Sequence, residues 1–393
     1  MSFLNNNINK ISEYPFTRLR KLLSTENLSN KNNILDLSIG QPYHKFPLFV
    51  KSVLAKENIK WGLYPPIRGL PILRNSYLKW LKKRFNVKSS FFGNENILPL
   101  SGTREGLFSI SLVLSVKQII VPNPFYQVYL GSSLFQNLPI SFMNTNIKEN
   151  YLLDIDNLRN KIKKTPSLIY FCNPSNPQGK CASANYLKEL IDVVRRYKSI
   201  LVLDECYTDI YTQKKPVGGI EVCQEAGKSL KNVLIFHSLS KRSNVAGLRS
   251  GFVVGDKKII NLFSKLRSYS APTIPLPIQI LSAKLWSDER HVNESRENYN
   301  IKFNYADKIL SSYNCYSRPE AGFYLWMNVG NGEKFTKELY KNFNIKVMPG
   351  KYLSVGASNN PGKKFVRVSL VHSNLKSKEA INKIAKQLKC FQH

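Results

Sequence analysis

A lysine placed among hydroxyl side chains is the residue of this chain best suited to covalent chemistry. Lys241 lies in the segment Ser238-Leu239-Ser240-Lys241-Arg242, directly after the apolar run Val233–Phe236, and Arg249 follows eight residues later. An amine of this kind can form a Schiff base while the neighbouring hydroxyl and guanidinium groups hold a phosphate. The segment therefore indicates a site for a phosphorylated aldehyde such as pyridoxal 5'-phosphate.

A carboxylate and an amide follow two further apolar runs. Asp204 ends the run Ile200–Leu203 and Tyr207 comes three residues later, while Asn176 lies in a proline-rich turn after Leu168–Cys172. Alpha/beta sheets bind ligands beyond the carboxyl ends of their strands. At that edge Asp204 can keep a pyridine nitrogen protonated, and Asn176 and Tyr207 can donate to a phenolate oxygen.

Together these segments resemble the fold-type I, class I and II aminotransferases. The motifs Asn173-Pro174-x-Asn176-Pro177-x-Gly179, Asp204-x-x-Tyr207 and Ser238-x-Ser240-Lys241 with Arg249 follow the order of that family, and 28 residues lead from Asn176 to Asp204 and 37 from Asp204 to Lys241. The resemblance implies an enzyme that binds pyridoxal 5'-phosphate, uses amino acids and 2-oxo acids as substrates, and needs no metal. Its expected catalytic residues are Lys241, Asp204 and Tyr207.

The same resemblance implies an α/β fold with two domains. Residues 46–275 are expected to form a large cofactor-binding domain, in which a mainly parallel sheet lies between helices. Residues 1–45 and 276–393 are expected to form a smaller α+β domain from the two ends of the chain. The alternation of strand and helix patterns up to about residue 270 agrees with βαβ units, and the proline-rich segment Pro272–Pro277 marks the boundary.

Further matches to the family complete the expected site. A phosphate is expected at Ser101–Arg104, where free backbone N–H groups open a helix, and Tyr126 matches the aromatic residue that stacks on the cofactor ring. Tyr64 matches a tyrosine that reaches the phosphate of the neighbouring subunit, which implies a homodimer with shared active sites. The expected cofactor-binding residues are Gly102, Thr103, Arg104, Tyr126, Asn176, Asp204, Tyr207, Ser238, Ser240, Lys241, Arg249 and Tyr64.

Three residues are expected to bind the substrate: Gly40, Asn176 and Arg367. Arg367 lies within the apolar segment Phe365–Leu370, where a charge is costly without an anion partner. Its planar fork suits a carboxylate, and the family uses the matching arginine for the substrate α-carboxylate. A buried salt bridge within the protein is the alternative.

Five segments resemble the bacterial N-succinyldiaminopimelate aminotransferases of lysine biosynthesis, which use glutamate as amino donor. The segments are 14–20, 37–44, 101–108, 123–129 and 321–326, although Gly40-Gln41-Pro42 replaces the usual Gly-Glu-Pro. Because both substrates carry extra carboxylates, a second cationic anchor is expected among Arg18, Arg20, Arg68 and Arg104. His44 lines the pocket or lies in a surface loop.

Two alternative functions are compared with these residues, and only the first accounts for the whole set. An aspartate or aromatic aminotransferase, or a carbon–sulfur lyase that uses the same cofactor, shares the whole set. A transcription regulator with a degenerate aminotransferase domain needs an added DNA-binding module, and only 13 residues precede Tyr14.

The composition of the chain argues against several other classes of protein. Of the 393 residues, 58 are Lys or Arg and 26 are Asp or Glu, giving a formal net charge of +32, but the basic residues are scattered and predict no specific nucleic-acid site. No apolar run is long enough to span a membrane, and Met1–Asn7 has no signal pattern. The six cysteines lack metal-site spacing and are expected as reduced thiols. A cytoplasmic enzyme is predicted.

Overall fold

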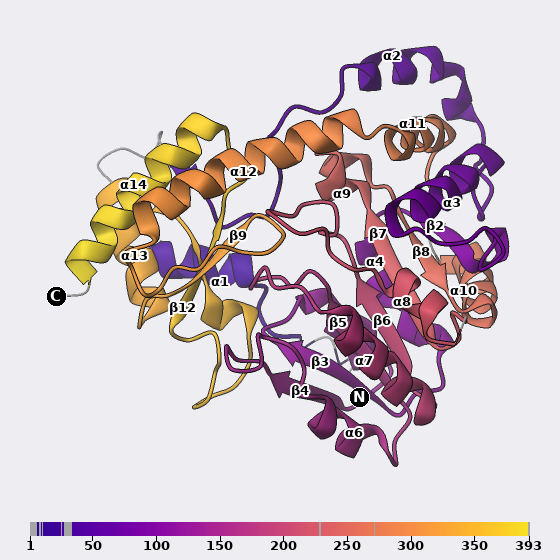
Figure 1. The fold of residues 1–393 in the computed structure, drawn as a ribbon, viewed down its shortest axis with the longest axis horizontal. Helices are drawn as coiled ribbons and strands as arrows, with labels where there is room; N and C mark the ends of the chain where they lie inside the picture. The colour runs from indigo at the N-terminus through magenta and orange to yellow at the C-terminus, as the bar shows by residue number, and fades with distance from the viewer. Residues whose placement is uncertain are drawn as a thin grey trace.

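A seven-stranded sheet organises the larger part of the chain (Figure 1). Its strand order is β2-β8-β7-β6-β5-β3-β4, and only β8 runs antiparallel to its neighbours. The strands are β2 (Ile97–Leu100), β3 (Gln118–Asn123), β4 (Ile140–Asn144), β5 (Ser167–Cys172), β6 (Ile200–Asp204), β7 (Val233–Ser238) and β8 (Gly251–Gly255). The expectation of a mainly parallel sheet is confirmed.

Helices cover both faces of this sheet, because side chains alternate along each strand and both faces are apolar. In β6, Leu201 and Leu203 belong to the core on one face, with Leu73 of α3 and Leu190 of α7, whereas Val202 belongs to the core on the other. The helices of this part are α2 (Phe49–Lys56), α3 (Pro71–Phe85), α4 (Thr103–Ser109), α5 (Gly131–Phe135), α6 (Ile155–Ile162), α7 (Ala184–Arg196), α8 (Gly219–Glu225), α9 (Leu239–Arg242), α10 (Lys257–Ser270) and α11 (Leu276–Ser287).

Several helix ends follow directly from local sequence. Pro71 occupies the first position of α3, where its missing N–H costs nothing, and Asn86 ends that helix in the left-handed conformation. The side chains of Asp154 and Ser183 accept backbone N–H groups at the starts of α6 and α7. These caps fix where the strands that follow each helix enter the sheet.

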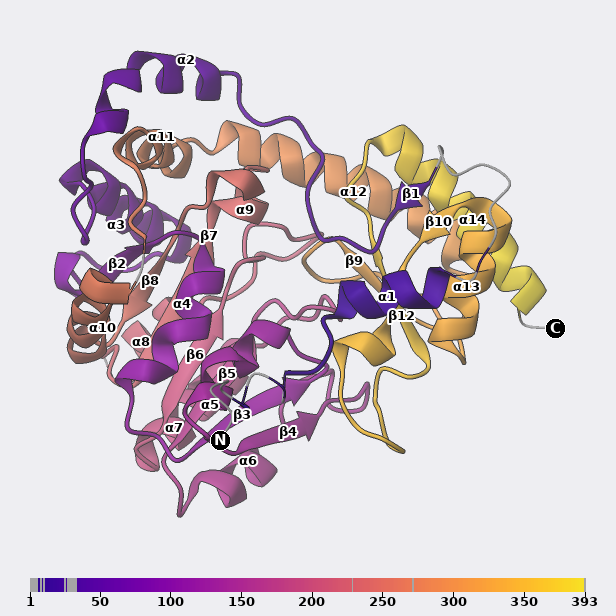
Figure 2. The same ribbon diagram turned by 180° about the vertical axis from the view of Figure 1, so that it is seen from behind.

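The two ends of the chain meet in a second group of elements (Figure 2). A three-stranded antiparallel sheet contains β11 (Met348–Pro349), β12 (Phe365–Ser369) and β9 (Tyr324–Asn328), and β1 (Leu35–Asp36) pairs in parallel with β10 (Ile345–Lys346). Around them lie α1 (Pro15–Leu23), α12 (Arg290–Leu310), α13 (Gly332–Phe343) and α14 (Asn374–Phe391). The long helix α12 runs from the region of α9 and α11 to α14 (Figures 1 and 2).

Short 3₁₀ segments connect several elements. They are Asn58–Gly62, Asn94–Asn96, Ile110–Val113, Gln127–Leu130, Ala246–Leu248 and Gly350–Leu353. The computed structural model describes residues 6, 7, 9, 11–24, 26, 34–227, 229–270 and 272–391. Most of the segment Met1–Asn7, in which no signal pattern was expected, lies outside these residues.

Element boundaries differ from expectation in two places. The sequence pattern predicts a helix over residues 46–56, but this helix begins at Phe49. It also predicts a strand over residues 345–348, which divides into β10 and β11 in two different sheets. Helix α11 packs against α3 and α2, beside the large sheet. The division into domains at residues 45 and 275 remains a prediction.

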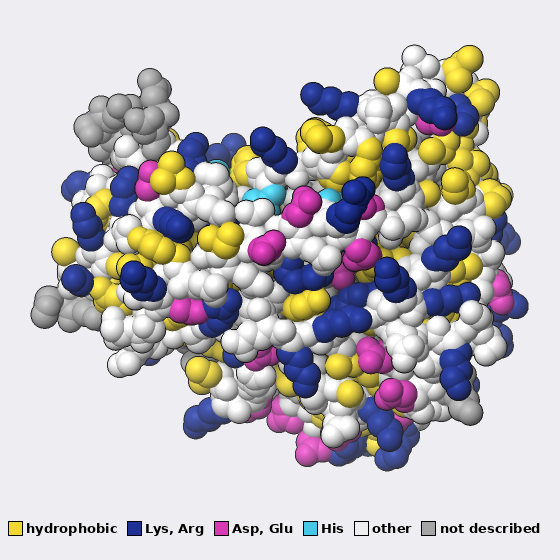
Figure 3. Space-filling model, turned by 45° about the horizontal axis from the view of Figure 1, so that its top comes forward, with side chains coloured by type: hydrophobic (Ala, Val, Ile, Leu, Met, Phe, Trp, Pro, Cys, Tyr) yellow, Lys and Arg dark blue, Asp and Glu magenta, His cyan; other side chains and the backbone are white. Residues whose placement is uncertain are grey.

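The folded chain shows how charged and apolar side chains are distributed over its surface and along its helices. On the face seen in Figure 3, lysine and arginine side chains are spread among acidic and apolar ones. Within the described residues, no helix combines the length and the apolar character needed to cross a bilayer.

Candidate active site

A cavity of about 440 Å³ lies at the carboxyl ends of the parallel strands, where the two groups of elements meet. It is enclosed by residues from β5, β6 and β7, by the start of α4, and by β9, β12 and the segment before α1. Twelve of the expected site residues line it: Gly40, Thr103, Arg104, Tyr126, Asn176, Asp204, Tyr207, Ser238, Ser240, Lys241, Arg249 and Arg367. Gly102 and Tyr64 do not.

Lys241 projects into this cavity from the short helix α9. Its amine donates to the carbonyl oxygen of Gly40. The pKa of Lys241 is lowered to about 8: burial lowers it most, the Cys206 thiol opposes this, and the positive charges of Arg367, Arg249 and Arg104 add to the decrease. A neutral amine is therefore accessible near physiological pH, which a nucleophile or a proton carrier requires.

Asp204 forms the opposite wall and is 5% exposed. Its Oδ2 accepts a hydrogen bond of 2.8 Å from the hydroxyl of Tyr129, and its Oδ1 accepts a weaker one of 3.4 Å from the N–H of Cys206. Burial raises the pKa of Asp204, whereas these donors and the charge of Lys241 lower it. No ion pair involves Asp204 among the residues that the structure describes. The Asp204 carboxyl is thus free to pair with a cationic ligand group.

A hydrogen-bonded chain joins the predicted residues Asn176, Tyr207 and Arg367. Asn176 donates to the hydroxyl of Tyr207 at 3.3 Å and accepts from Arg367 at 3.1 Å. The Tyr207 hydroxyl lies 3.1 Å from that of Tyr324, whose ring packs under the Arg367 guanidinium at 4.5 Å. A second Arg367 nitrogen donates to the Ser38 carbonyl at 2.8 Å.

Arg367 has a guanidinium group that is only partly hydrogen-bonded within the protein. It is 6% exposed and its Nε has no hydrogen-bond partner. In the described part of the chain it forms no ion pair, so the alternative of a buried salt bridge is not observed there. A buried guanidinium without an anion is suited to a carboxylate ligand.

The turn before α4 faces the segment that follows Lys241. Gly102 has a φ of +82°, and a Cβ at this position would come within 2.1 Å of an Arg249 guanidinium nitrogen. Nearby, Ser238 and Ser240 are linked by a hydrogen bond of 3.0 Å between their hydroxyls. Glycine at position 102 therefore allows Arg249 to lie against the start of α4, and the hydroxyl and guanidinium donors converge.

Arg104 lies at the mouth of the cavity. Its Nε donates to the hydroxyl of Tyr126 at 2.9 Å, and its NH2 group donates to that of Tyr14 at 3.3 Å. The other three arginines considered for the second anchor lie outside the cavity. Arg18 packs on the ring of Tyr352, Arg20 bonds to Thr17, and Arg68 bonds to Asn261.

His44 occupies neither of its two expected environments. It is half-buried rather than exposed and does not line the cavity. Its ring nitrogens lie 3.2 Å from the Ser295 hydroxyl and 2.6 Å from the amine of Lys302. Burial and the charge of Lys302 lower the pKa of His44 to about 3. The residue fixes the entering chain to α12, and both expectations were wrong.

Two tyrosines of the site were missed. Tyr129 contacts Asp204, and Tyr324 joins Tyr207 to Arg367. A weak signal existed, because Tyr129 follows Tyr126 by three residues and a hydroxyl needs a partner when buried.

Comparison with known proteins decides the family. The family described as aminotransferase class I and II matches residues 32–384. This chain belongs to the class I and II aminotransferase family. An LL-diaminopimelate aminotransferase from Dehalococcoides mccartyi is 27% identical, covering 97% of this chain and 98% of the relative. An aspartate aminotransferase from Pyrococcus horikoshii is 28% identical, covering 95% and 94%.

A solved structure agrees with this assignment. The crystal structure of an aminotransferase from Neisseria meningitidis is 34% identical, with a TM-score of 0.91 over 98% of this chain and 99% of that chain. The fold of this aminotransferase is therefore fold type I, as the sequence predicted.

Proposed function

We propose that this aminotransferase uses pyridoxal 5'-phosphate to move an amino group between glutamate and N-succinyl-2-amino-6-oxopimelate, forming 2-oxoglutarate and N-succinyl-LL-diaminopimelate in lysine biosynthesis. One observation carries the chemical part of the proposal. Lys241, with its lowered pKa, and Asp204, without a cationic partner in the described residues, line the same cavity.

The donor set fits the cofactor. Ser238, Ser240, Arg249 and the backbone from Gly102 to Arg104 would hold the phosphate, and Tyr126 would stack on the ring. Asp204 would hold the ring nitrogen, and Asn176 with Tyr207 would donate to the phenolate oxygen. When bound, the cofactor supplies an electron sink for carbanion chemistry.

Lys241 carries the proton transfer in this proposal. Its amine would hold the resting cofactor, and with substrate bound the free amine would take a proton from the substrate α-carbon. The lowered pKa supports this role because about half of the amine is neutral near pH 8. Tyr207 keeps its hydroxyl proton as a donor, since burial raises its pKa well above the usual value.

Arg367 is proposed to bind the substrate α-carboxylate. Asn176 holds one edge of the guanidinium in place, and the ring of Tyr324 supports its face. Gly40 must remain small beside this position, because a Cβ there would lie 1.9 Å from the Tyr324 hydroxyl.

Arg104 is proposed as the anchor for a second carboxylate. Two tyrosine hydroxyls orient its guanidinium at the mouth of the cavity, and it pairs with no carboxylate among the described residues. The substrates named for the two relatives, LL-diaminopimelate and aspartate, also carry a second carboxylate. These relatives favour LL-diaminopimelate or aspartate as the alternative substrates.

A homodimer with shared active sites is also proposed. The segment from Ile59 to Tyr64 exposes large apolar side chains: Ile59 is 83% exposed, Trp61 52%, Leu63 60% and Tyr64 fully. Such a cluster on one short segment favours contact with a second copy, and it would bring Tyr64 toward the partner's phosphate.

The substrate assignment is tested by donor preference. The wild-type enzyme should transfer the amino group of N-succinyl-LL-diaminopimelate to 2-oxoglutarate with a higher kcat/KM than LL-diaminopimelate, aspartate, phenylalanine or cystathionine. Arg104→Gln should lower kcat/KM for the dicarboxylic donors by about 10- to 100-fold, the effect of losing a charge-assisted pair, and leave phenylalanine nearly unchanged. Arg20→Gln, outside the cavity, is the matched control. Equal losses for all donors would contradict the role of Arg104.

A further inference from the structure

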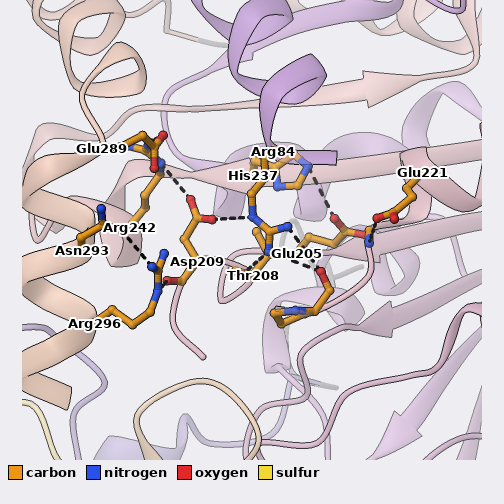
Figure 4. A network of polar contacts seen from close by, with 12 residues as sticks. Arg84, Glu205, Thr208, Asp209, Glu221, His237, Arg242, Glu289, Asn293 and Arg296 are labelled. Carbon is orange, nitrogen blue, oxygen red and sulfur yellow. Dashed lines mark hydrogen bonds and ion pairs between the residues drawn. The ribbon is translucent and has the colours of Figure 1, made fainter. Parts of the chain in front are cut away.

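Two buried ionisable side chains, Glu205 and His237, lie next in sequence to residues of the proposed cofactor site, and Figure 4 shows them together. Glu205 follows Asp204 at the end of β6, and His237 precedes Ser238 in β7. Because successive side chains of a strand face opposite sides, Asp204 and Ser238 face the cavity while Glu205 and His237 face α3 and α8. The N–H of Glu205 donates to the Phe236 carbonyl at 3.0 Å, which holds the two strand ends together.

The polar atoms of this pair are incompletely bonded. Glu205 is 1% exposed; its Oε1 accepts from the N–H of Gly219 at 2.6 Å, and its Oε2 has no hydrogen-bond partner. That oxygen lies 3.6 Å from His237 Nε2, and neither ring nitrogen of His237 has a hydrogen bond. The rings of Trp80 and Phe252 pack beside His237. Buried polar atoms rarely remain without partners.

A small cavity adjoins these atoms. Its volume is about 10 Å³ and its wall includes Glu205, His237, Trp80 and Trp286. The indole N–H groups of both tryptophans also have no partner. A buried water needs about this much space and two to four polar neighbours, and the wall supplies them.

The nearby cations are already bound to other carboxylates. Arg84 donates to Asp209 Oδ1 and Arg242 donates to Asp209 Oδ2, each at 2.9 Å. Arg242 also pairs with Glu289 at 2.5 Å. Figure 4 shows these pairs beside Glu205. No cation is therefore in direct contact with the Glu205 carboxyl within the described residues.

The surrounding charges decide where the proton lies. The pKa of Glu205 is raised to about 8: burial raises it most, the negative charges of Glu221 and Asp204 also raise it, and the Gly219 N–H and Arg84 oppose them. Burial and Arg84 lower the pKa of His237 to about 3, against Asp209. At neutral pH the carboxyl holds the proton and the imidazole is uncharged.

We propose that protonated Glu205 and neutral His237 bind one water molecule in the small cavity that both residues line, and act as a positioning pair behind the cofactor site. The carboxyl donates to the water, and the water donates to His237 Nε2. Asp204 is then the only ionised carboxylate at the end of β6, and no second charge competes for the group it binds. The inference rests on the proposed function, because it concerns the carboxylate assigned to the cofactor ring.

The test compares Glu205→Gln with wild type in the full chain saturated with pyridoxal 5'-phosphate. Thermal midpoints are measured from pH 5.5 to 8.5. Because folding raises the pKa of Glu205 from 4.5 to about 8, wild type has the full stability of the protonated carboxyl below about pH 4.5 and loses it as the pH rises to about 8. Glutamine does not titrate. The thermal midpoint of Glu205→Gln, measured relative to that of wild type, should therefore rise by several degrees from pH 5.5 to 8.5.

Glu338→Gln is the matched control, since it removes a half-buried carboxylate that is not among the groups whose charge acts on Glu205. The difference between the thermal midpoint of this control and that of wild type should stay constant over the same pH range. The proposal is overturned if the difference in thermal midpoint between Glu205→Gln and wild type stays constant with pH, or if wild type becomes relatively more stable as the pH rises. Either result would show an ionised Glu205.

Two further readouts complete the test. A high-resolution crystal structure should show one water within hydrogen-bond distance of Glu205 Oε2 and His237 Nε2, and a direct contact between these atoms without water would overturn the bridge. The visible absorbance of the lysine-bound cofactor, recorded on the same samples, reports on the proposed function. If wild type lacks it, the cofactor assignment fails, whereas the pH-dependent difference still tests the pair.

Discussion

At the scale of single residues, the cavity combines four cationic side chains with one free carboxylate. Lys241, Arg104, Arg249 and Arg367 all line it, and Asp204 faces them. Such a concentration of one charge in a concave, partly dry site attracts anions and strengthens their binding. Burial is the main reason for the lowered pKa of Lys241, and the charges of the three arginines also lower it, so they favour both anion binding and a neutral amine.

The role of Arg367 predicts a specific kinetic result. Arg367→Lys keeps the charge but removes the planar fork, so one of two parallel hydrogen bonds to the α-carboxylate is lost. We expect KM for the amino donor to rise by about 10- to 100-fold, with a smaller change in kcat. Steady-state kinetics with glutamate measures both parameters. An unchanged KM would mean that another group binds the α-carboxylate.

Several of these residues could be predicted from sequence because each follows a recognisable strand or turn. Asp204 and Asn176 come at the ends of apolar runs, and Lys241 follows another. Tyr129 and Tyr324 could not be assigned, since their partners come from distant segments. The pairing of Glu205 with His237 likewise depends on the register of β6 against β7.

At the scale of elements, the turn between β2 and α4 depends on a close approach of the Arg249 side chain to the backbone of Gly102. The left-handed conformation of Gly102 turns the chain into α4, and Arg249, itself at a φ of +55°, reaches back across it. Neither segment forms the proposed phosphate site alone. The site therefore depends on the antiparallel strand β8, which begins two residues after Arg249 and pairs with β2.

The contact between Gly102 and the Arg249 guanidinium can be tested with a matched pair of alanine variants. In Gly102→Ala the new Cβ clashes with Arg249 and the backbone is strained, at a cost of about 1–3 kcal/mol. We expect a lower thermal midpoint and a Kd for pyridoxal 5'-phosphate raised at least about tenfold. Gly247→Ala, where no atom lies within 4 Å of the added Cβ, should change neither. Equal effects of the two variants would contradict the proposed contact.

Short elements limited what the sequence could predict at this scale. The apolar runs of the sequence mark the central strands, and the sequence predicts helices over about 288–311 and 376–388, which lie within a few positions of α12 and α14. It could not divide residues 345–349 between two sheets, because two-residue strands contain too few side chains to show a period. The antiparallel direction of β8 also depends on tertiary pairing rather than on its own composition.

At the scale of the whole molecule, association must overcome a large positive charge. The formal net charge of +32 makes two copies repel each other at long range. A stable dimer therefore needs a sizeable apolar contact, which the exposed side chains of Ile59, Trp61 and Leu63 can supply. Salt should favour association, because it screens the repulsion and leaves the apolar contact intact.

Shared active sites predict complementation between two inactive or weakened chains. Lys241→Ala and Tyr64→Ala subunits are co-expressed with different tags, and the mixed dimer is purified on both tags in turn. In this dimer one site combines the intact Lys241 of one subunit with the intact Tyr64 of the other, and the second site lacks both. We expect about half of the wild-type activity per dimer, since one of two equivalent sites is intact.

The comparison with each parent dimer makes the result decisive. Dimers of Lys241→Ala have no functional site, and those of Tyr64→Ala lack a phosphate donor in both sites, so their cofactor binding should be weak. If Tyr64 acted within its own subunit, the mixed dimer would contain no intact site and could not exceed the average of its parents. Activity above that average, measured at limiting pyridoxal 5'-phosphate where phosphate binding controls occupancy, therefore requires that Tyr64 cross the subunit boundary.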